Sequence, residues 1–146
     1  MKVTSKYTVA IQIMLCIAHY TLKRKVTSAF LAESTNADAT IVRRILGQLQ
    51  AAGFVTVRPG VGGAYIVKPL SEITLLDIYK AVGAEQDSLF RYYDLKECKC
   101  EIGLNLHTVL DPHFHDIQRA MENEMKKVTL EQVHEEMDAV MGAQKF

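Results

Sequence analysis

The spacing of the apolar residues changes at Gly53, and this change limits the possible folds more than any other feature of the 146-residue chain. Between about Ala39 and Ala52 the apolar residues recur every third or fourth position, which is typical of a helix that packs on one side. Beyond Gly53, apolar runs at 54–57 and 65–67 flank a glycine-rich segment. The two runs therefore predict strands that are joined as a hairpin, with its tip at 59–63.

Two further helices are predicted ahead of this helix and hairpin. Ser5 can cap the first helix, whose apolar residues repeat at helical spacing, so that we expect it to be largely buried. The second helix is short, begins at Thr27 and turns Phe30 and Leu31 inward, and a turn at 34–37 follows it. Helix, turn, helix and hairpin in this order predict a winged helix-turn-helix.

The helix at 39–52 has two sides of different chemistry. The apolar side is predicted to hold Ile41, Ile45, Leu49 and Ala52, flanked by Val42 and Leu46. The opposite side holds Thr40, Arg43, Arg44, Gly47 and Ala51. An apolar side anchors the helix to a core, and the opposite side suits entry into a major groove of DNA. The two arginines can pair with guanine edges or hold phosphates, whereas the plain alternative is an ordinary solvated face.

Charge is divided unevenly along a chain whose net charge is zero. Residues 1–70 contain nine Lys or Arg and two acidic residues, a net charge of +7. Residues 71–146 contain eight basic and fifteen acidic residues, a net charge of −7. The first half therefore suits a phosphate backbone, where Arg58 and Lys68, expected at the base of the hairpin, can neutralise phosphates.

The second half reads as three more helices. The segment 74–82 is amphipathic, and 83–100 is weakly patterned. A long apolar stripe follows from about Glu101 to Met125, and Pro112 predicts either a kink or a fresh helix start at 111–112. Thr129 with Gln132 predicts a capping box for the last helix.

Three segments of the sequence resemble those of a known bacterial family. They are Gly53-Phe54-Val55, Gly60-Val61-Gly62-Gly63-Ala64-Tyr65 and Ile73-Thr74-Leu75-Leu76-Asp77-Ile78. This pattern is similar to that of the Rrf-type winged-helix transcription regulators, which include the iron-sulfur cluster regulator, the nitric-oxide-sensing repressor and the cysteine-metabolism repressor. The resemblance runs from Thr4 to about Met125.

The resemblance implies a sequence-specific regulator of transcription, most often a repressor, that binds double-stranded DNA at a near-palindromic operator. It implies a homodimer through the helix at about Glu101 to Met125. Carried over residue by residue, it implies Thr40, Arg43 and Arg44 as contacts of the recognition helix, with Lys6, Thr27 and Ser28 as backbone contacts. Pro59 stands where the family often has a basic residue, and Ala64 is typical of the branch without a cluster.

The predicted fold class is mainly α with a small β-hairpin. Residues 1–82 form the winged helix-turn-helix domain, and residues 83–146 form a linker, the dimerisation helix and a C-terminal helix.

Three cysteines, an odd number, argue against a disulfide framework and for a reducing compartment. Cys98 and Cys100 offer two thiols where an iron–sulfur cluster usually takes four ligands, with only Glu97 and His107 as nearby additions, so that we expect no cofactor. The preferred interpretation of this pair is structural or incidental. The alternative is a redox sensor in which Lys96 and Lys99 lower a thiol pKa. Cys16 is expected in the core.

Other classes of function receive less support from the sequence. His107, His113 and His115 lack metal-ligand spacing and are interpreted as solvated or half-buried side chains rather than a metal site. No nucleophile with a base and no phosphate-binding loop is visible, so that we do not expect an enzyme. The most apolar run, at 9–18, is too short to cross a membrane and no leader pattern is evident, and we expect a cytoplasmic protein. The alternative function is a winged-helix protein-interaction module that binds an acidic partner.

Overall fold

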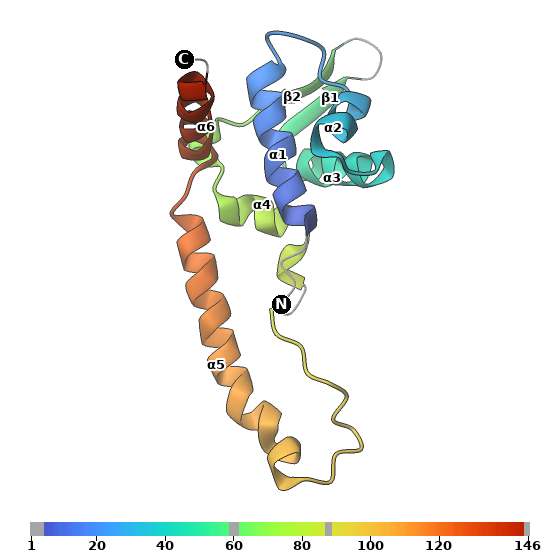
Figure 1. Ribbon diagram of the computed structural model, residues 1–146, viewed down its shortest axis with the longest axis vertical. Helices are drawn as coiled ribbons and strands as arrows, with labels where there is room; N and C mark the ends of the chain where they lie inside the picture. The colour runs from blue at the N-terminus through green and yellow to red at the C-terminus, as the bar shows by residue number, and fades with distance from the viewer. Residues whose placement is uncertain (1–4, 59–61, 87–88, 145–146) are drawn as a thin grey trace.

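The computed structural model describes residues 5–58, 62–86 and 89–144. Its elements, in chain order, are α1 (Ser5–Tyr20), α2 (Ser28–Thr35), α3 (Ala39–Ala51), β1 (Val55–Arg58), β2 (Gly63–Ile66), the 3-10 turn η1 (Leu70–Glu72), α4 (Leu75–Ala81), the 3-10 turn η2 (Ala84–Gln86), α5 (Glu101–Lys126) and α6 (Leu130–Gln144) (Figure 1). The predicted class, mainly helical with one small hairpin, is confirmed.

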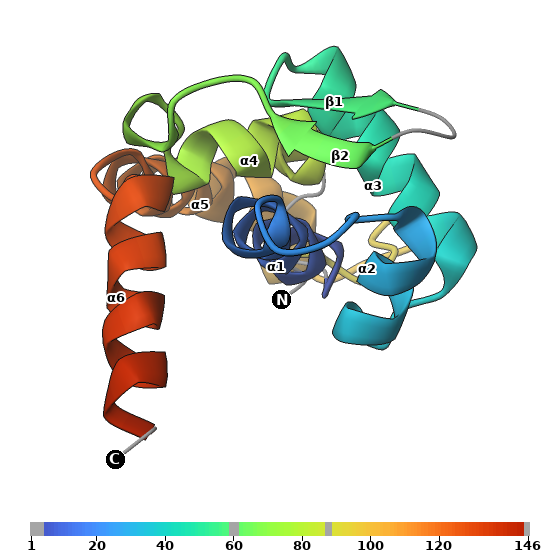
Figure 2. The same ribbon diagram turned by 90° about the horizontal axis from the view of Figure 1, so that it is seen from above.

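Helices α1 to α4 and the hairpin enclose one apolar core, with α1 passing through its middle (Figure 2). Ile13, Met14 and Ile17 of α1 are fully buried, as the apolar pattern of this helix predicts. Tyr79 of α4 is also buried, and its ring meets that of Tyr7 edge to face at 5.4 Å between centroids. This shared core makes α1 to α4 and the hairpin one rigid unit.

The turn between α2 and α3 is shorter than predicted. Thr27 caps α2 by accepting a hydrogen bond from the backbone N–H of Phe30. Residues 34–35, assigned to the turn by the sequence, continue α2, and the Thr35 hydroxyl donates to the Leu31 carbonyl at 2.7 Å. Asn36, in the left-handed conformation at φ 56°, ends the helix. The prediction of a turn across all of 34–37 was therefore wrong at its start.

The two strands pair antiparallel from Val55 opposite Ile66 to Arg58 opposite Gly63. Phe54 and Val67, predicted within strands, lie just outside them, and the predicted tip at 59–61 lies outside the described residues. Gly63 opens β2 at φ 77° and sits against the backbone of Val26, where any side chain would overlap the Val26 carbonyl. The Ala64 N–H donates to that carbonyl at 2.8 Å, which fixes the hairpin beside the start of α2.

The chain returns from α5 to the core beside α4. The Leu75 N–H donates to the Val128 carbonyl at 2.9 Å, and the Leu130 N–H donates to the Ile73 carbonyl at 2.7 Å. Thr74 caps α4 in a full capping box with Asp77, which the sequence analysis missed. At α6 only half of the predicted box is seen, because the Gln132 side chain donates to Glu136 while its backbone N–H donates to Thr129.

Helix α5 extends away from the core as an arm, with the segment 89–100 beside it (Figure 1). It runs as one helix through Pro112, so that of the two predicted alternatives, a kink or a fresh helix start at 111–112, the fresh start was wrong. Asp111 does not cap a helix there, and its carboxylate accepts a hydrogen bond from the Tyr92 hydroxyl at 2.7 Å. No residue of α5 is fully buried, and Ile102 and Val109 are 74% and 60% exposed.

Candidate nucleic-acid interface

Helix α3 is held by four buried residues and turns its polar side outward. Val42, Ile45 and Leu49 are fully buried, and Leu46 is 5% exposed. The residues predicted on the opposite side, Thr40, Arg43, Arg44, Gly47 and Ala51, are all exposed. The prediction was wrong for Ile41, which is 42% exposed, and for Ala52, which is exposed as well. The buried stripe is the tighter one at i, i+3, i+4 and i+7 that starts from Val42.

The start of α3 carries one acidic group. The Asp38 carboxylate caps the helix by accepting a hydrogen bond from the Thr40 N–H at 2.7 Å. That backbone bond lowers the pKa of Asp38, with smaller help from the Thr40 hydroxyl and the Arg43 charge. Arg43 and Arg44 lie exposed one turn further on.

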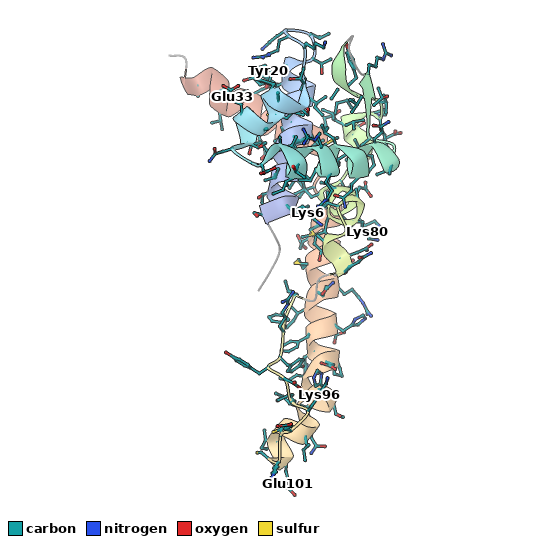
Figure 3. The ribbon with its side chains drawn as sticks, turned by 90° about the vertical axis from the view of Figure 1, so that its right-hand side faces the viewer. Lys6, Tyr20, Glu33, Lys80, Lys96 and Glu101 are labelled. Carbon is teal, nitrogen blue, oxygen red and sulfur yellow. The ribbon has the colours of Figure 1, made fainter. Side chains whose placement is uncertain are left out.

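Two grooves flank α3 and contain most of the other predicted contact residues. Lys6 of α1 and Arg44 line one groove of about 520 Å³ beside the start of α3. Figure 3 shows Lys6 next to this helix. Thr27, Ser28 and Arg58 line a second groove of about 200 Å³ between the start of α2 and the hairpin. The fold thus brings five of the predicted residues from four elements to the two flanks of α3.

The second groove also contains Lys25, which the sequence analysis did not select. The run Lys23-Arg24-Lys25 was the available signal. Arg24 stacks its guanidinium on the Phe30 ring at 3.8 Å, which holds this basic segment against α2.

The two basic residues of the hairpin lie at its opposite ends, which corrects their placement together at its base. Arg58 pairs with Gly63 at the tip end of the ladder, and its guanidinium lies 5.2 Å from the centroid of the Tyr65 ring. Lys68 follows the other end of β2, with its ammonium 5.5 Å from the centroid of the Phe54 ring. The register of the ladder separates them, and only Arg58 lines the groove beside α2.

The thiols at the start of α5, which is the end of the arm furthest from the core, differ from each other (Figure 3). Cys100 is exposed at the position before α5, and backbone N–H groups of Gly103 and Ile102 lower its pKa. The start of α5 therefore lowers the pKa of Cys100. The sequence had predicted that Lys96 and Lys99 would lower a thiol pKa. The Cys98 sulfur lies 3.9 Å from the Cys100 carbonyl and packs on Gly103, where any side chain would overlap it. Cys16 is buried in the core, as expected.

An exposed basic helix on a buried support, with a hairpin fixed beside it, is the arrangement of a winged helix-turn-helix DNA-binding protein. The chain belongs to the Rrf2 family, whose model, described as iron-dependent transcriptional regulator, matches residues 3–136. These are regulators of transcription and not enzymes.

Individual proteins agree with this assignment. YwnA of Bacillus subtilis (strain 168), named as an HTH-type transcriptional regulator, is 36% identical over 131 residues, which cover 90% of this chain and 96% of YwnA. The fold is similar to that of T. potens IscR, with a TM-score of 0.68 at 19% identity over 94% of this chain and 88% of IscR. It is also similar to Staphylococcus aureus CymR in its oxidized form, with a TM-score of 0.68 at 18% identity over 92% and 97%.

The description of the family model names iron. Within 5–58, 62–86 and 89–144, Cys98, Cys100 and His107 do not come together as a group of three metal ligands. His107 Nδ1 instead lies 3.1 Å from an Asp111 carboxylate oxygen, and the His107 ring packs against the Tyr92 ring.

Across residues 5–58, 62–86 and 89–144, no helix has the length and apolar character needed to cross a bilayer.

Proposed function

We propose that the protein is a homodimeric regulator, acting as a repressor, that binds a near-palindromic operator with α3 in the major groove. The observation that carries this proposal is the exposed Arg43 and Arg44 on a helix whose other side is fully buried. A helix fixed in this way can present guanidinium groups to base edges without the cost of ordering it on binding.

The flanking residues supply the contacts that position α3. Lys6 on one side and Ser28 with Arg58 on the other offer cations and a hydroxyl to the phosphates on either edge of the groove. Lys25 joins them, whereas Lys68 lies further from this group and is expected to contribute less. Contacts with phosphates contribute to the affinity for any duplex, whereas contacts of α3 with base edges determine which DNA sequence is bound.

A dimer is supported by the apolar side of α5. Ile102, Val109 and Ile117 are 74%, 60% and 47% exposed along one stripe of the helix. A second copy of the arm that crosses this stripe would bury it and would set two recognition helices about one turn of DNA apart, or a multiple of that.

Titration with duplex DNA at several salt concentrations tests the proposal. Operator fragments selected from the source genome should bind with an affinity that falls steeply with salt, because counterions are released from the phosphates. Random duplexes of equal length should bind much more weakly. Equal, weak binding of both would contradict the proposal and favour the alternative, a module whose basic face binds an acidic protein.

We further propose that Cys98 and Cys100 make DNA binding sensitive to oxidants. Cys100 is exposed and its lowered pKa favours the reactive thiolate. Oxidation of the pair by hydrogen peroxide would join the two sulfurs, pass two electrons and two protons to the peroxide and release two water molecules. A disulfide across this segment would alter the start of α5 at the far end of the arm, and with it the way two arms cross and the placement of the two α3 helices.

Peroxide treatment followed by mass spectrometry and DNA titration tests this sensitivity. Oxidation should change operator affinity in the wild-type protein but not in Cys100→Ser, and Cys16→Ser should behave as wild type. If oxidation at Cys100 leaves operator affinity unchanged, the thiols have no regulatory role.

A further inference from the structure

We propose that His19, His134 and Asp138 form a binding site for a divalent first-row transition-metal ion between α1 and α6. His19 lies in the last turn of α1, and His134 and Asp138 are four residues apart on α6. A separation of four places two side chains on the same face of a helix. The site is separate from the thiols at the start of α5, and it does not depend on the function proposed above.

The distances between the ligand atoms suit one ion. His19 Nδ1 lies 3.8 Å from Asp138 Oδ1, and His134 Nδ1 lies 3.6 Å from Asp138 Oδ2. One ligand atom from each of the three residues lies within 4.8 Å of the others. With bonds of about 2.0–2.1 Å, ligands around a tetrahedral zinc ion are about 3.4 Å apart. Small side-chain rotations therefore close the site.

The burial of the three side chains leaves room for the ion and for water. The side chains of His19, His134 and Asp138 are 25%, 22% and 51% exposed. His134 Nε2 is buried and has no hydrogen-bond partner among the described residues, so that Nδ1 is the ring nitrogen open to an ion. Three protein ligands and one open position are typical of zinc sites that keep a bound water.

The surroundings of His19 are compatible with binding. Its ring is held by an edge-to-face contact with Tyr20 at 4.6 Å between centroids. The Lys23 ammonium lies 3.3 Å from His19 Nε2, which identifies Nδ1 as the nitrogen that faces Asp138 and the ion. Lys23 is exposed and can turn toward solvent when an ion is bound. Imidazole with one carboxylate favours transition metals over Mg²⁺ and Ca²⁺, which take oxygen ligands.

A bound ion would fix α6 beyond its anchored start. The start of α6 is anchored by buried Leu130 and its hydrogen bond to Ile73. Further along, a groove of about 370 Å³ separates α6 from α1 and is lined by Met137 and Met141 on one side and by Ile11 and Leu15 on the other. Metal bonds across this groove would join α6 directly to α1 and so to the winged helix-turn-helix.

Calorimetric titration of the untagged full-length protein with Zn²⁺ tests the site. All variants carry Cys98→Ser and Cys100→Ser, because free thiolates bind zinc themselves. This background should bind one Zn²⁺ per chain, and His19→Gln and Asp138→Asn should each weaken that binding by more than about tenfold, since even outer-shell partners change metal affinity by about 10–100-fold. His113→Gln, which removes an exposed histidine of α5, is the matched control and should bind like the background.

Two further readings accompany the titration. Co²⁺ should give the intense visible absorption of a four-coordinate site in the background and lose it in His19→Gln, and Mg²⁺ should not bind. Saturating Zn²⁺ should raise the melting temperature of the background protein and not that of Asp138→Asn. The melting temperatures of the two metal-free proteins are compared to show that both are folded. Unchanged zinc affinity in His19→Gln and Asp138→Asn, or an equal loss in His113→Gln, would overturn the proposal.

Discussion

Arg43 and Arg44 differ from the other basic residues because their backbone is fixed by a fully buried helix face. Replacing either by alanine should weaken operator binding by about 1–3 kcal/mol if its guanidinium reads a base, and the loss should depend on operator sequence. A phosphate contact would instead weaken binding to all duplexes alike and lower the salt dependence. Fluorescence anisotropy with operator and random duplexes at several salt concentrations measures both.

Arg119→Ala is the matched control for these two substitutions. Arg119 is an exposed residue of α5, where it pairs with His115 at 2.9 Å, and its loss should leave operator affinity unchanged. Operator affinity that stays at the wild-type value in both Arg43→Ala and Arg44→Ala would show that α3 is not the recognition helix.

At the scale of elements, the polar part of the contact between the segment 89–92 and α5 centres on the Asp111 carboxylate. The Tyr92 hydroxyl donates to Asp111 at 2.7 Å and lowers the pKa of that carboxyl, with a further contribution from His107. The same contact raises the pKa of Tyr92 to about 12, chiefly through desolvation and then through the bond to Asp111. Phe90 stacks on Phe114 at 4.3 Å beside this pair.

The Asp111 carboxylate should therefore make this contact sensitive to acid. Because its folded pKa is lowered, the stabilisation is complete above the ordinary carboxyl value of about 3.9 and is lost as the pH falls through the lowered value. In Tyr92→Phe the pKa of Asp111 should rise toward the ordinary value, and an NMR titration of the side-chain carboxyl would measure this. Tyr93→Phe, at a side chain that is 95% exposed, should leave the pKa unchanged. An equal pKa of Asp111 in wild type and Tyr92→Phe would contradict the role of this bond.

For the whole molecule, the arm is the feature that one chain alone does not explain. Val109 lies 60% exposed in the middle of the apolar stripe of α5. Val109→Glu should weaken a dimer by more than tenfold, or about 1.4 kcal/mol, because the interface would bury an unpaired charge. Light scattering across a dilution series measures the dissociation, and operator affinity should fall with it.

Thr108→Glu adds the same charge at an exposed position about 100° around α5 from Val109, outside the stripe of Ile102, Val109 and Ile117, and should leave the dimer intact. A dimer that survives in Val109→Glu, or one that is lost equally in Thr108→Glu, would place the interface on another surface of the molecule.

The amino-acid sequence by itself determined the elements and the face of α3 that meets solvent. Local rules were sufficient there, since the period of apolar residues, the cap at Thr27 and the glycine of the hairpin act within a few residues of each other. These rules failed at Ile41, where two helical periods of apolar residues lay close together. At Pro112 they left a kink and a fresh helix start open, and the fresh start did not occur.

Only the tertiary structure decided which distant residues become neighbours. Lys6 lines the same groove as Arg44, and Arg58 lies at the other end of the hairpin from Lys68. His19 lies 3.8 Å from Asp138 across 118 intervening positions of the chain. Each of these relations depends on how helices pack and on the register of a ladder, because contacts between remote segments arise from the burial of a shared core. No spacing within a single segment encodes that geometry.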